Sequence, residues 1–356
     1  MSSKKFLKVV FALLVFGILS IGGVNYIVDP FQQYRVKTFY PIAFTNQRYQ
    51  NAGLSKNFEY DSLILGTSMT ENFILDEVEK KLNFNKLIKL SVSGGSAKEQ
   101  STTLKTAIEN NDNLKNVLWG LDIFAFIGEP DRLRNGLDSF PFYLYDKNIL
   151  NDNKYLLSTD TLKESFKAII RPLVRKDEFL YNYNIMYQWQ HKYEKEFSLE
   201  YIIKAWKNRE TFINYEKEKQ GIFYLKNSFE INFLNLIQDN PKINFKIFFP
   251  PYSILHFKIY EEINQVKDIL EFKRYIYDNL LMFNNVEIYD FQSEKTITHN
   301  LGNYKDLSHY HQKINTWMIE EIKENNYLVT KDNIDEHLEN IRKQIEEYDL
   351  NKLGLD

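Results

Sequence analysis

Two short segments at opposite ends of the chain carry side chains that together could perform nucleophilic chemistry. The first, DSLILGTS at residues 61–68, is an apolar run that breaks at a glycine and ends in Ser68. The second, KDLSH at residues 305–309, contains Asp306 and His309. A serine hydroxyl is a poor nucleophile until an imidazole accepts its proton, and that imidazole needs a carboxylate to fix its tautomer. We therefore predict Ser68, His309 and Asp306 as catalytic residues for acyl chemistry.

These residues can meet only if the fold gathers distant turns, and the hydrophobic pattern predicts such a fold. Short apolar runs alternate with segments whose apolar residues recur at helical spacing. The expected strands cover residues 62–66, 86–92, 117–121 within the stretch 116–126, 245–249 and 286–291. The expected helices cover residues 73–82, 97–108, 260–282 and 312–323. This alternation predicts an α/β domain with a parallel sheet and helices on both faces.

In open α/β sheets, ligands bind beyond the carboxyl ends of the strands. Ser68 follows the first expected strand, Gly94 and Gly95 follow the second, and Asp122 follows the third. The segment at residues 306–309 follows the last strand. A parallel sheet would therefore bring four distant segments to one crevice.

With these turns in place, the chain resembles the SGNH hydrolase superfamily. More narrowly, it is similar to membrane-anchored members that accompany surface-polymer acylation, such as alginate O-acetylation proteins and teichoic-acid D-alanylation proteins. The resemblance covers residues 58–126 and 243–323. The matching positions are Gly66-Thr67-Ser68 for the first block, Gly94 or Gly95 for the second, Gly120-Leu121-Asp122 for the third, and Asp306-Leu307-Ser308-His309 for the last.

The resemblance implies a three-layer SGNH or flavodoxin-like fold and a catalytic triad without a cofactor. His309 would take the proton of Ser68, Asp306 would orient His309, and Ser68 would attack an ester carbonyl. The backbone amides of Ser68 and of Gly94 or Gly95 would hold the oxyanion. Water as the second nucleophile would give an esterase, and a polymer hydroxyl would give a transferase.

Two positions depart from the family pattern. The first block is not the full Gly-Asp-Ser-Leu sequence. The third block of family members carries an asparagine whose amide donates to the oxyanion, whereas this chain has Asp122. Because an ionised carboxylate only accepts hydrogen bonds, three roles stay open for Asp122: part of the oxyanion site, an anchor for a loop, or a contact to a substrate hydroxyl or ammonium group.

The N-terminus predicts a membrane anchor. Lys4, Lys5 and Lys8 precede residues 9–28, a stretch without charge. About 20 apolar residues span a bilayer, and flanking lysines favour the cytoplasmic side. No Ala-x-Ala cleavage site follows. We predict an uncleaved signal anchor with the body on the extracytoplasmic side of the cell membrane; the alternative is a cleaved signal peptide.

The remaining segments complete the expected domain organisation. Residues 127–240 are rich in Tyr, Lys, Glu and Asn and predict a helical insertion or cap. The tail has an apolar stripe at Ile334, Leu338 and Ile341, which should pack on the domain or on a partner. The expected units are a cytoplasmic stub and anchor at 1–30, an irregular juxtamembrane segment at 31–57, the α/β domain at 58–126 and 241–325, the insertion at 127–240, and a charged helix at 326–356.

Composition argues against several other classes of protein. The chain of 356 residues has a net charge of -3 and no basic stripe, so nucleic acid is not an expected partner. It has no cysteine, which excludes disulfides and thiolate catalysis. The histidines are scattered, and His309 and His311 are only two residues apart, so no metal site is expected. His256 follows the expected strand at residues 245–249 and could line the crevice, although a surface loop fits its position better.

We therefore expect a single-pass membrane protein whose body acts as a serine esterase or O-acyltransferase on a cell-surface polysaccharide or teichoic acid. The resemblance also implies a multispanning membrane acyltransferase as partner. The alternative of another class is a non-catalytic scaffold or glycan-binding module. A lipase would require a large apolar crevice. The acyl group could be acetyl, D-alanyl or longer.

Overall fold

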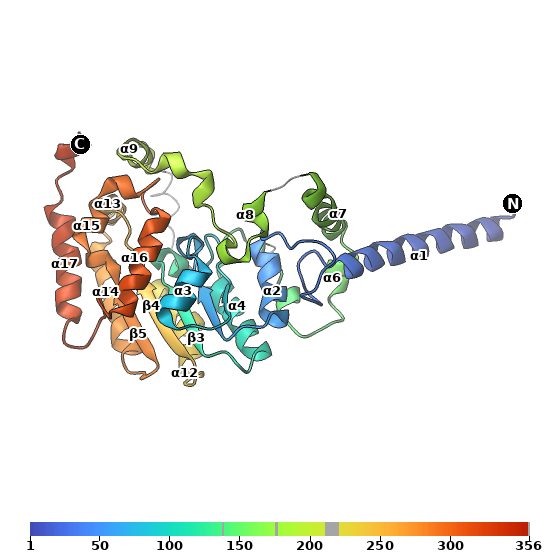
Figure 1. Cartoon of the computed structure of the whole chain (residues 1–356), viewed down its shortest axis with the longest axis horizontal. Helices are drawn as coiled ribbons and strands as arrows, with labels where there is room; N and C mark the ends of the chain where they lie inside the picture. Colours follow the sequence, from blue (N-terminus) through green and yellow to red (C-terminus); the bar gives the residue numbers. More distant parts are fainter. Residues whose placement is uncertain (137–138, 175–176, 211–220, 355–356) are drawn as a thin grey trace.

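The computed structural model describes residues 1–136, 139–174, 177–210 and 221–354 of the chain. Figure 1 shows an α/β body from one end of which a single long helix projects. The body is built around one sheet, and most of its buried apolar side chains form one large core on the two faces of that sheet. A smaller buried cluster includes Phe31, Phe140 and Tyr155.

The sheet has five parallel strands in the order β2-β1-β3-β4-β5. Leu63 of β1 lies in register with Ile88 of β2 on one side and Val117 of β3 on the other, and all three are fully buried. Burial on both faces explains why these strands are continuous apolar runs. The strands are β1 (Ser62–Leu65), β2 (Leu87–Lys89), β3 (Asn116–Gly120), β4 (Asn244–Phe249) and β5 (Val286–Asp290). The predicted α/β class with a parallel sheet is confirmed.

Helices cover both faces of the sheet (Figure 1). On one face, α3 packs against α16; on the other, α11 packs against both α4 and α14. Trp119 of β3 stacks on Phe233 in the second layer with ring centroids 3.8 Å apart, and Phe73 meets Phe248 edge-on at 5.7 Å. The bounds are α3 (Leu75–Leu82), α4 (Ala97–Asn110), α11 (Ile222–Phe229), α14 (Val266–Leu280) and α16 (Gln312–Lys323).

The strand order reverses at β1. From β1 the chain moves outward to β2 and then returns to form β3 on the other side of β1. The loops that leave the carboxyl ends of β1 and β3 therefore diverge, and a crevice opens between them.

The strand expected around residues 117–121 is confirmed as β3, after which the chain turns at Asp122 into a 3-10 helix, η2 (Ile123–Phe126). Two expected segments differ from the structure. The single helix expected at residues 260–282 is two helices, α13 (Ile254–Glu262) and α14, separated by Asn264 in a left-handed conformation at φ 57°. Part of the supposedly irregular segment at 31–57 forms α2 (Gln47–Asn57), which is buried against α4.

The segment between β3 and β4 has two parts. The last part runs from α11 through a π turn (Glu230–Leu234) into α12 (Asn235–Gln238), and its Phe229, Phe233 and Ile237 are fully buried in the core of the sheet. It serves as the crossover helix that leads into β4. The earlier part contains one long helix, α7 (Thr159–Val174). Its shorter helices are α5 (Phe142–Tyr145), α6 (Asn153–Leu156), α8 (Glu178–Tyr181) and α9 (Leu199–Lys207).

The projecting helix is α1 (Ser3–Val28). Among the described residues it is the one helix long and apolar enough to cross a membrane, so it can serve as a membrane anchor or as a signal sequence. Its last turn nevertheless belongs to the body. The Asn25 side chain is fully buried, donates to the carbonyl oxygens of Leu156 at 2.8 Å and Ser158 at 3.0 Å, and accepts from the Ser165 hydroxyl at 3.0 Å.

The C-terminal helix α17 (Ile334–Glu347) packs against α13 and α14. Ile334, Leu338 and Ile341 are all buried in the main core. The predicted apolar stripe is confirmed, and the domain itself covers it. Short helices complete the body: α15 (Lys295–Thr298) and the 3-10 helices η1 (Ser68–Thr70), η4 (Tyr183–Ile185), η5 (Gln190–Lys192), η6 (Glu194–Glu196), η8 (Phe291–Ser293), η9 (Leu301–Asn303) and η10 (Leu350–Leu353).

Because Ile341 is 1% exposed, shortening its side chain should leave a cavity in the core. We expect Ile341→Ala to lower the free energy of unfolding by about 2–5 kcal/mol. Chemical unfolding of the detergent-solubilised full chain would measure this. Glu336→Ala, an exposed position in the first turn of the same helix, should change stability by less than about 0.5 kcal/mol. Equal, small effects of both substitutions would contradict the placement of α17 in the core.

Candidate active site

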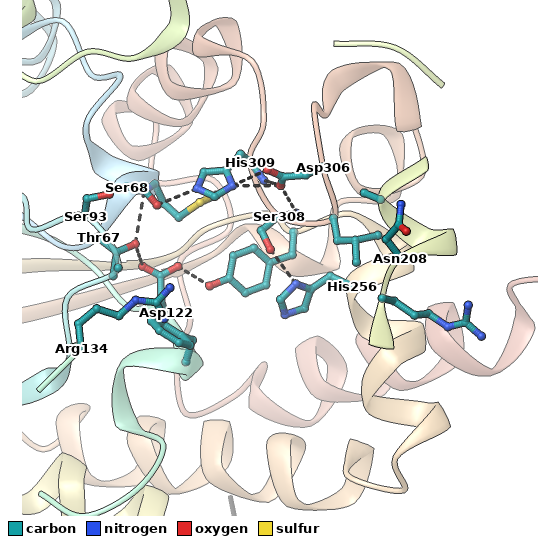
Figure 2. Close-up of a pocket in the computed structure, with 17 residues that line it drawn as sticks. Thr67, Ser68, Ser93, Asp122, Arg134, Asn208, His256, Asp306, Ser308 and His309 are labelled. Atoms are coloured by element: carbon teal, nitrogen blue, oxygen red, sulfur yellow. Dashed lines mark hydrogen bonds and ion pairs between the residues drawn. The ribbon is translucent and has the colours of Figure 1, made fainter. Parts of the chain in front are cut away.

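A cavity of about 630 Å³ lies beyond the carboxyl ends of the central strands. Its wall includes the turn after β1, the turn after β2, the loop after β3 and the segment that precedes α16. Ser68, Gly94, Asp122, Asp306 and His309 all line it (Figure 2). The predicted convergence of four distant segments is therefore what the structure shows, and of the predicted site residues only Gly95 lies outside the wall.

Ser68, His309 and Asp306 form a continuous hydrogen-bonded chain, drawn with dashed lines in Figure 2. The Ser68 Oγ lies 2.8 Å from His309 Nε2. On the far side of the ring, His309 Nδ1 lies 2.9 Å from Asp306 Oδ2 and 3.0 Å from Oδ1. These are the distances required of a nucleophile, a base and a residue that orients the base.

A tight turn after β1 brings Ser68 into the cavity. Gly66 has φ +143°, a conformation that side chains rarely adopt. A Cβ atom on Gly66 would lie 2.6 Å from Thr70 Cγ2 and 3.1 Å from the Gly120 carbonyl oxygen. The glycine therefore lets the chain turn closely past β3, and Ser68 becomes the first residue of the 3-10 helix η1.

The loop that carries Asp306 and His309 is closed by its own backbone. Tyr304 and Tyr310 form an antiparallel bridge, and the Lys305 amide donates to the His309 carbonyl at 3.1 Å. Both tyrosines are buried, and their hydroxyl groups attach the loop to the core of the domain. The Tyr304 hydroxyl donates to the Pro251 carbonyl at 2.7 Å, and the Tyr310 hydroxyl donates to the Met69 carbonyl at 3.2 Å. The imidazole is thereby held against the serine turn.

Asp306 is surrounded by donors. Its Oδ1 accepts from the backbone amides of Ser308 at 3.0 Å and His309 at 2.8 Å, and its Oδ2 accepts from Lys305 Nζ at 2.9 Å. Burial alone would raise the pKa of this carboxyl, but His309, Lys305 and the amides outweigh burial and hold the pKa well below its usual range. An ionised Asp306 keeps the proton on Nδ1 of His309, so Nε2 is free to accept the Ser68 proton.

Asp122 connects the loops on the two sides of the crevice. Its Oδ2 accepts from the Thr67 hydroxyl at 2.5 Å, and its Oδ1 accepts from the Tyr252 hydroxyl. Both oxygens are therefore engaged, and the side chain is 2% exposed. Burial raises the pKa of Asp122 to about 6, although the two hydroxyl donors and the nearby His309 oppose this shift. Of the roles left open by the sequence, this geometry corresponds to the loop anchor, which fixes the residue preceding Ser68.

The two glycines after β2 differ in their surroundings. Gly95 donates its amide hydrogen to the Val92 carbonyl at 2.7 Å, which closes a tight turn. Gly94 has φ +56° and lines the cavity. Within the described part of the chain, the Ser68 and Gly94 amides donate no hydrogen bond to another protein atom. Ser68 and Gly94 thus offer two amide donors at the cavity wall, whereas the amide of Gly95 is already used.

Trp189, which comes from the segment between β3 and β4, was not among the predicted site residues. Its Nε1 donates to the Ser68 carbonyl at 3.0 Å, and its ring meets the His309 ring edge-on with centroids 5.4 Å apart. Lys305 Nζ lies 5.2 Å from the Trp189 ring and 4.7 Å from the Tyr193 ring. Trp189 therefore contacts both the serine and the histidine of the chain.

The interpretation of His256 as a surface-loop residue is wrong. His256 lies in the first turn of α13, is 2% exposed and lines the cavity. Its Nδ1 is 2.9 Å from the Ser308 hydroxyl, and its Nε2 is 3.2 Å from the Tyr260 hydroxyl. Burial lowers its pKa to about 3, so the ring is neutral at physiological pH. The packing of α13 against the loop at residues 305–309 accounts for this burial.

No cluster of three or more His, Asp or Glu residues arranged to hold a metal ion occurs in the described ranges. A scan against protein-family models finds no match to this sequence, and a search of curated proteins finds none either. The functional interpretation therefore depends on the residues and geometry of the cavity.

The buried position of Asp122 predicts a pH-dependent stability. With a folded pKa near 6 and an unfolded value near 4, ionisation of Asp122 costs the folded state about 3 kcal/mol once the pH exceeds both values. Asp122→Asn removes this cost. We expect the variant to gain stability relative to the parent as the pH rises from about 4 through 6. Thermal unfolding across this range measures the difference, and a constant difference would contradict the burial argument.

The turn at Gly66 predicts a loss of serine reactivity on substitution. In Gly66→Ala the new methyl group must push Thr70 or the backbone of β3 away, so Ser68 moves relative to His309. A displacement of about 1 Å costs about 10²-fold in rate. The rate of Ser68 labelling by a fluorophosphonate would report this. Gly302→Ala, whose Cβ would lie 3.5 Å from its nearest neighbour, should label at the parental rate.

Proposed function

We propose that this chain is a membrane-anchored, SGNH-like serine esterase or O-acyltransferase that acts on a cell-surface polysaccharide or teichoic acid. The observation that carries the proposal is the hydrogen-bonded chain from Ser68 through His309 to Asp306 at the wall of a cavity. The order of the motifs along the chain and the parallel sheet with its β2-β1-β3-β4-β5 order agree with it.

In the first half of the reaction, His309 Nε2 takes the proton of Ser68 as Oγ forms a bond to the ester carbonyl carbon. The imidazolium that results is stabilised by the ionised Asp306. The tetrahedral intermediate then collapses, and the leaving alkoxide receives that proton from Nε2. The products of this half-reaction are a free alcohol and an acyl group esterified to Ser68.

The oxyanion of the intermediate would be held by the amides of Ser68 and Gly94, because the Gly95 amide is already bonded to Val92. Asp122 supports this arrangement indirectly by fixing Thr67. In the second half-reaction, His309 deprotonates water or a polymer hydroxyl, which attacks the acyl-enzyme and releases Ser68. The choice between these two nucleophiles separates an esterase from a transferase.

A small acyl group fits the cavity better than a pair of long lipid chains. The volume of the cavity, about 630 Å³, is within the range of sites for small molecules. The wall combines apolar side chains such as Phe124 and Leu307 with polar ones such as Tyr252 and Asn208. This mixture favours an acetyl or D-alanyl ester on a hydroxylated polymer over a lipase substrate.

The buried last turn of α1 supports an anchor that stays attached to the body. Removal of α1 would leave the Leu156 and Ser158 carbonyls without their Asn25 donor. The flanking lysines favour a cytoplasmic N-terminus, which puts the cavity on the extracytoplasmic side. There a multispanning membrane acyltransferase could act as the partner that supplies the acyl group.

A second candidate function is a non-catalytic scaffold or glycan-binding partner of such an acyltransferase. The observation that favours it is Asp122, which stands where family members have a donating asparagine and whose two oxygens already accept hydrogen bonds. Loss of one oxyanion donor typically costs about 10²–10³ in rate. A scaffold would tolerate the loss of Ser68, and an enzyme would not.

Turnover of a small chromogenic acetyl ester by the solubilised full chain tests the proposal. We expect Ser68→Ala and His309→Ala each to lower turnover by about 10⁴-fold or more, because the members of a triad act as a unit. Ser293 and His337 provide a matched control, since their side chains lie 3.4 Å apart on η8 and α17, outside the cavity. Ser293→Ala and His337→Ala should retain parental turnover.

Two outcomes would count against an enzyme of either kind. If the parent and all four variants turn over the ester alike, Ser68 is not an activated nucleophile. If the parent shows no turnover and Ser68 is not labelled by a fluorophosphonate, the scaffold function is favoured. Labelling without turnover would point to a transferase that excludes water and needs its polymer acceptor.

A further inference from the structure

Helix α7 exposes an apolar face that the fold does not cover. Phe166, Ile170 and Val174 recur every four residues and Leu173 follows Ile170 by three, so the four side chains share one side of the helix. They are 53%, 49%, 78% and 77% exposed. A face of large apolar side chains at this exposure is the mark of an interaction surface.

The opposite side of α7 attaches it to the membrane-crossing helix. Thr161 and Ser165 on that side are buried, and the Ser165 hydroxyl donates to Asn25 Oδ1 of α1 at 3.0 Å. Figure 1 shows α7 at the end of the body from which α1 projects, running across the direction of α1 and not along it. The apolar face of α7 thus lies beside the place where α1 leaves the body.

The contact with Asn25 fixes the position of α7 along α1, and so its depth in the bilayer when α1 spans it. The uncharged stretch at residues 9–28 is long enough to span the hydrocarbon core of a bilayer, about 30 Å. Asn25 precedes the end of that stretch by three residues, or about 4.5 Å along the helix axis. Ser165 therefore lies at the outer boundary of the hydrocarbon region when α1 spans the bilayer.

The charges on α7 suit the same position. Lys163, Lys167 and Arg171 recur every four residues, which puts three basic side chains next to the apolar face. Lys163 and Lys167 pair with Asp160 and Glu164 at the surface, at 2.8 Å and 2.6 Å. Exposed pairs of this kind are weak, so the lysines remain able to contact anionic headgroups. Basic residues flanking an apolar face are typical of helices that lie in the membrane interface.

We propose that α7 is a second membrane contact, which lies in the outer interface of the bilayer with Phe166, Ile170, Leu173 and Val174 among the acyl chains. This inference rests on the proposed anchoring by α1 and is independent of the proposed catalysis. Two contacts, α1 and α7, would fix the orientation of the body above the lipid surface, whereas α1 alone would leave it free to rotate about the helix axis.

The absence of cysteine allows one nitroxide label at a time. We would label Phe166→Cys, Ile170→Cys and Met282→Cys in the full chain and reconstitute it in phosphatidylethanolamine–phosphatidylglycerol vesicles. Met282 is the matched control, because it is an apolar residue that is 63% exposed and follows the end of α14 by two residues. Figure 1 shows α14 on the side of the body away from α1. The measurement is the accessibility of each label to oxygen, which concentrates in lipid, relative to a water-soluble nickel chelate.

We expect the oxygen-to-nickel ratio at Phe166 and Ile170 to exceed that at Met282 several-fold, and to correspond to a depth of about 5–10 Å below the headgroups. Equal ratios at all three positions would overturn the proposal. Labels that are protected only in native membranes would also overturn it, because they would indicate a protein partner. Labels that are protected only at a high protein-to-lipid ratio would overturn it as well, because they would indicate a second copy of the chain. Release of the chain from the vesicles by alkaline extraction would overturn the anchoring on which the inference rests. None of these readouts depends on ester turnover.

Discussion

The carbonyl oxygen of Met69 joins the two halves of the candidate site. It accepts hydrogen bonds from the Tyr310 hydroxyl at 3.2 Å and from Asn315 Nδ2 at 3.1 Å. All of these groups are buried, so the bonds are not exchanged with water. Since Met69 follows Ser68 and Tyr310 follows His309, this one acceptor fixes the serine turn against the histidine loop. The 2.8 Å contact between Ser68 and His309 depends on it.

A buried lysine ties the same turn to the rest of the molecule. Lys89 at the end of β2 is fully buried, and its Nζ donates to the carbonyls of Glu71 and Phe73 at 2.6 Å each and of Met186 at 3.0 Å. Burial lowers its pKa to about 7. Three carbonyls around one ammonium group hold the chain after the serine turn next to the segment that carries Trp189. The segment between β3 and β4 therefore contacts the serine turn directly and helps to hold it in place.

The sequence predicted those features that depend on periodicity and on strand ends. The α/β class, the helix at residues 312–323 and the meeting of Ser68, Asp306 and His309 follow from apolar runs and from turns at the carboxyl ends of parallel strands. Trp189 and Lys89 could not be predicted in the same way. Each reaches the site through contacts between segments about a hundred residues apart, and no local pattern encodes such contacts.

His256 illustrates the limit most clearly. Its neighbours in the sequence, residues 254–260, are mostly apolar, but a single short apolar run does not distinguish a buried helix from other structures. Only the packing of α13 under the loop at residues 305–309 makes it buried and neutral.

The two carboxylates of the site differ because their surroundings differ: the Asp122 side chain is buried, whereas the Asp306 side chain is 33% exposed and has stronger donors. Asp306 accepts from two backbone amides and an ammonium group, which favour its charged form, and its pKa is lowered. Asp122 accepts from two hydroxyls, which are weaker partners for a charge, and burial raises its pKa to about 6. Environments that push the pKa values of two acids apart separate their roles.

In the proposed mechanism, Asp306 provides a permanent negative charge behind His309. Asp122 keeps the serine turn in place and adds little charge of its own below about pH 6, where it is protonated. The stabilisation of an oxyanion must then come from the amides of Ser68 and Gly94, which are held in position by the turns at Gly66 and Gly95.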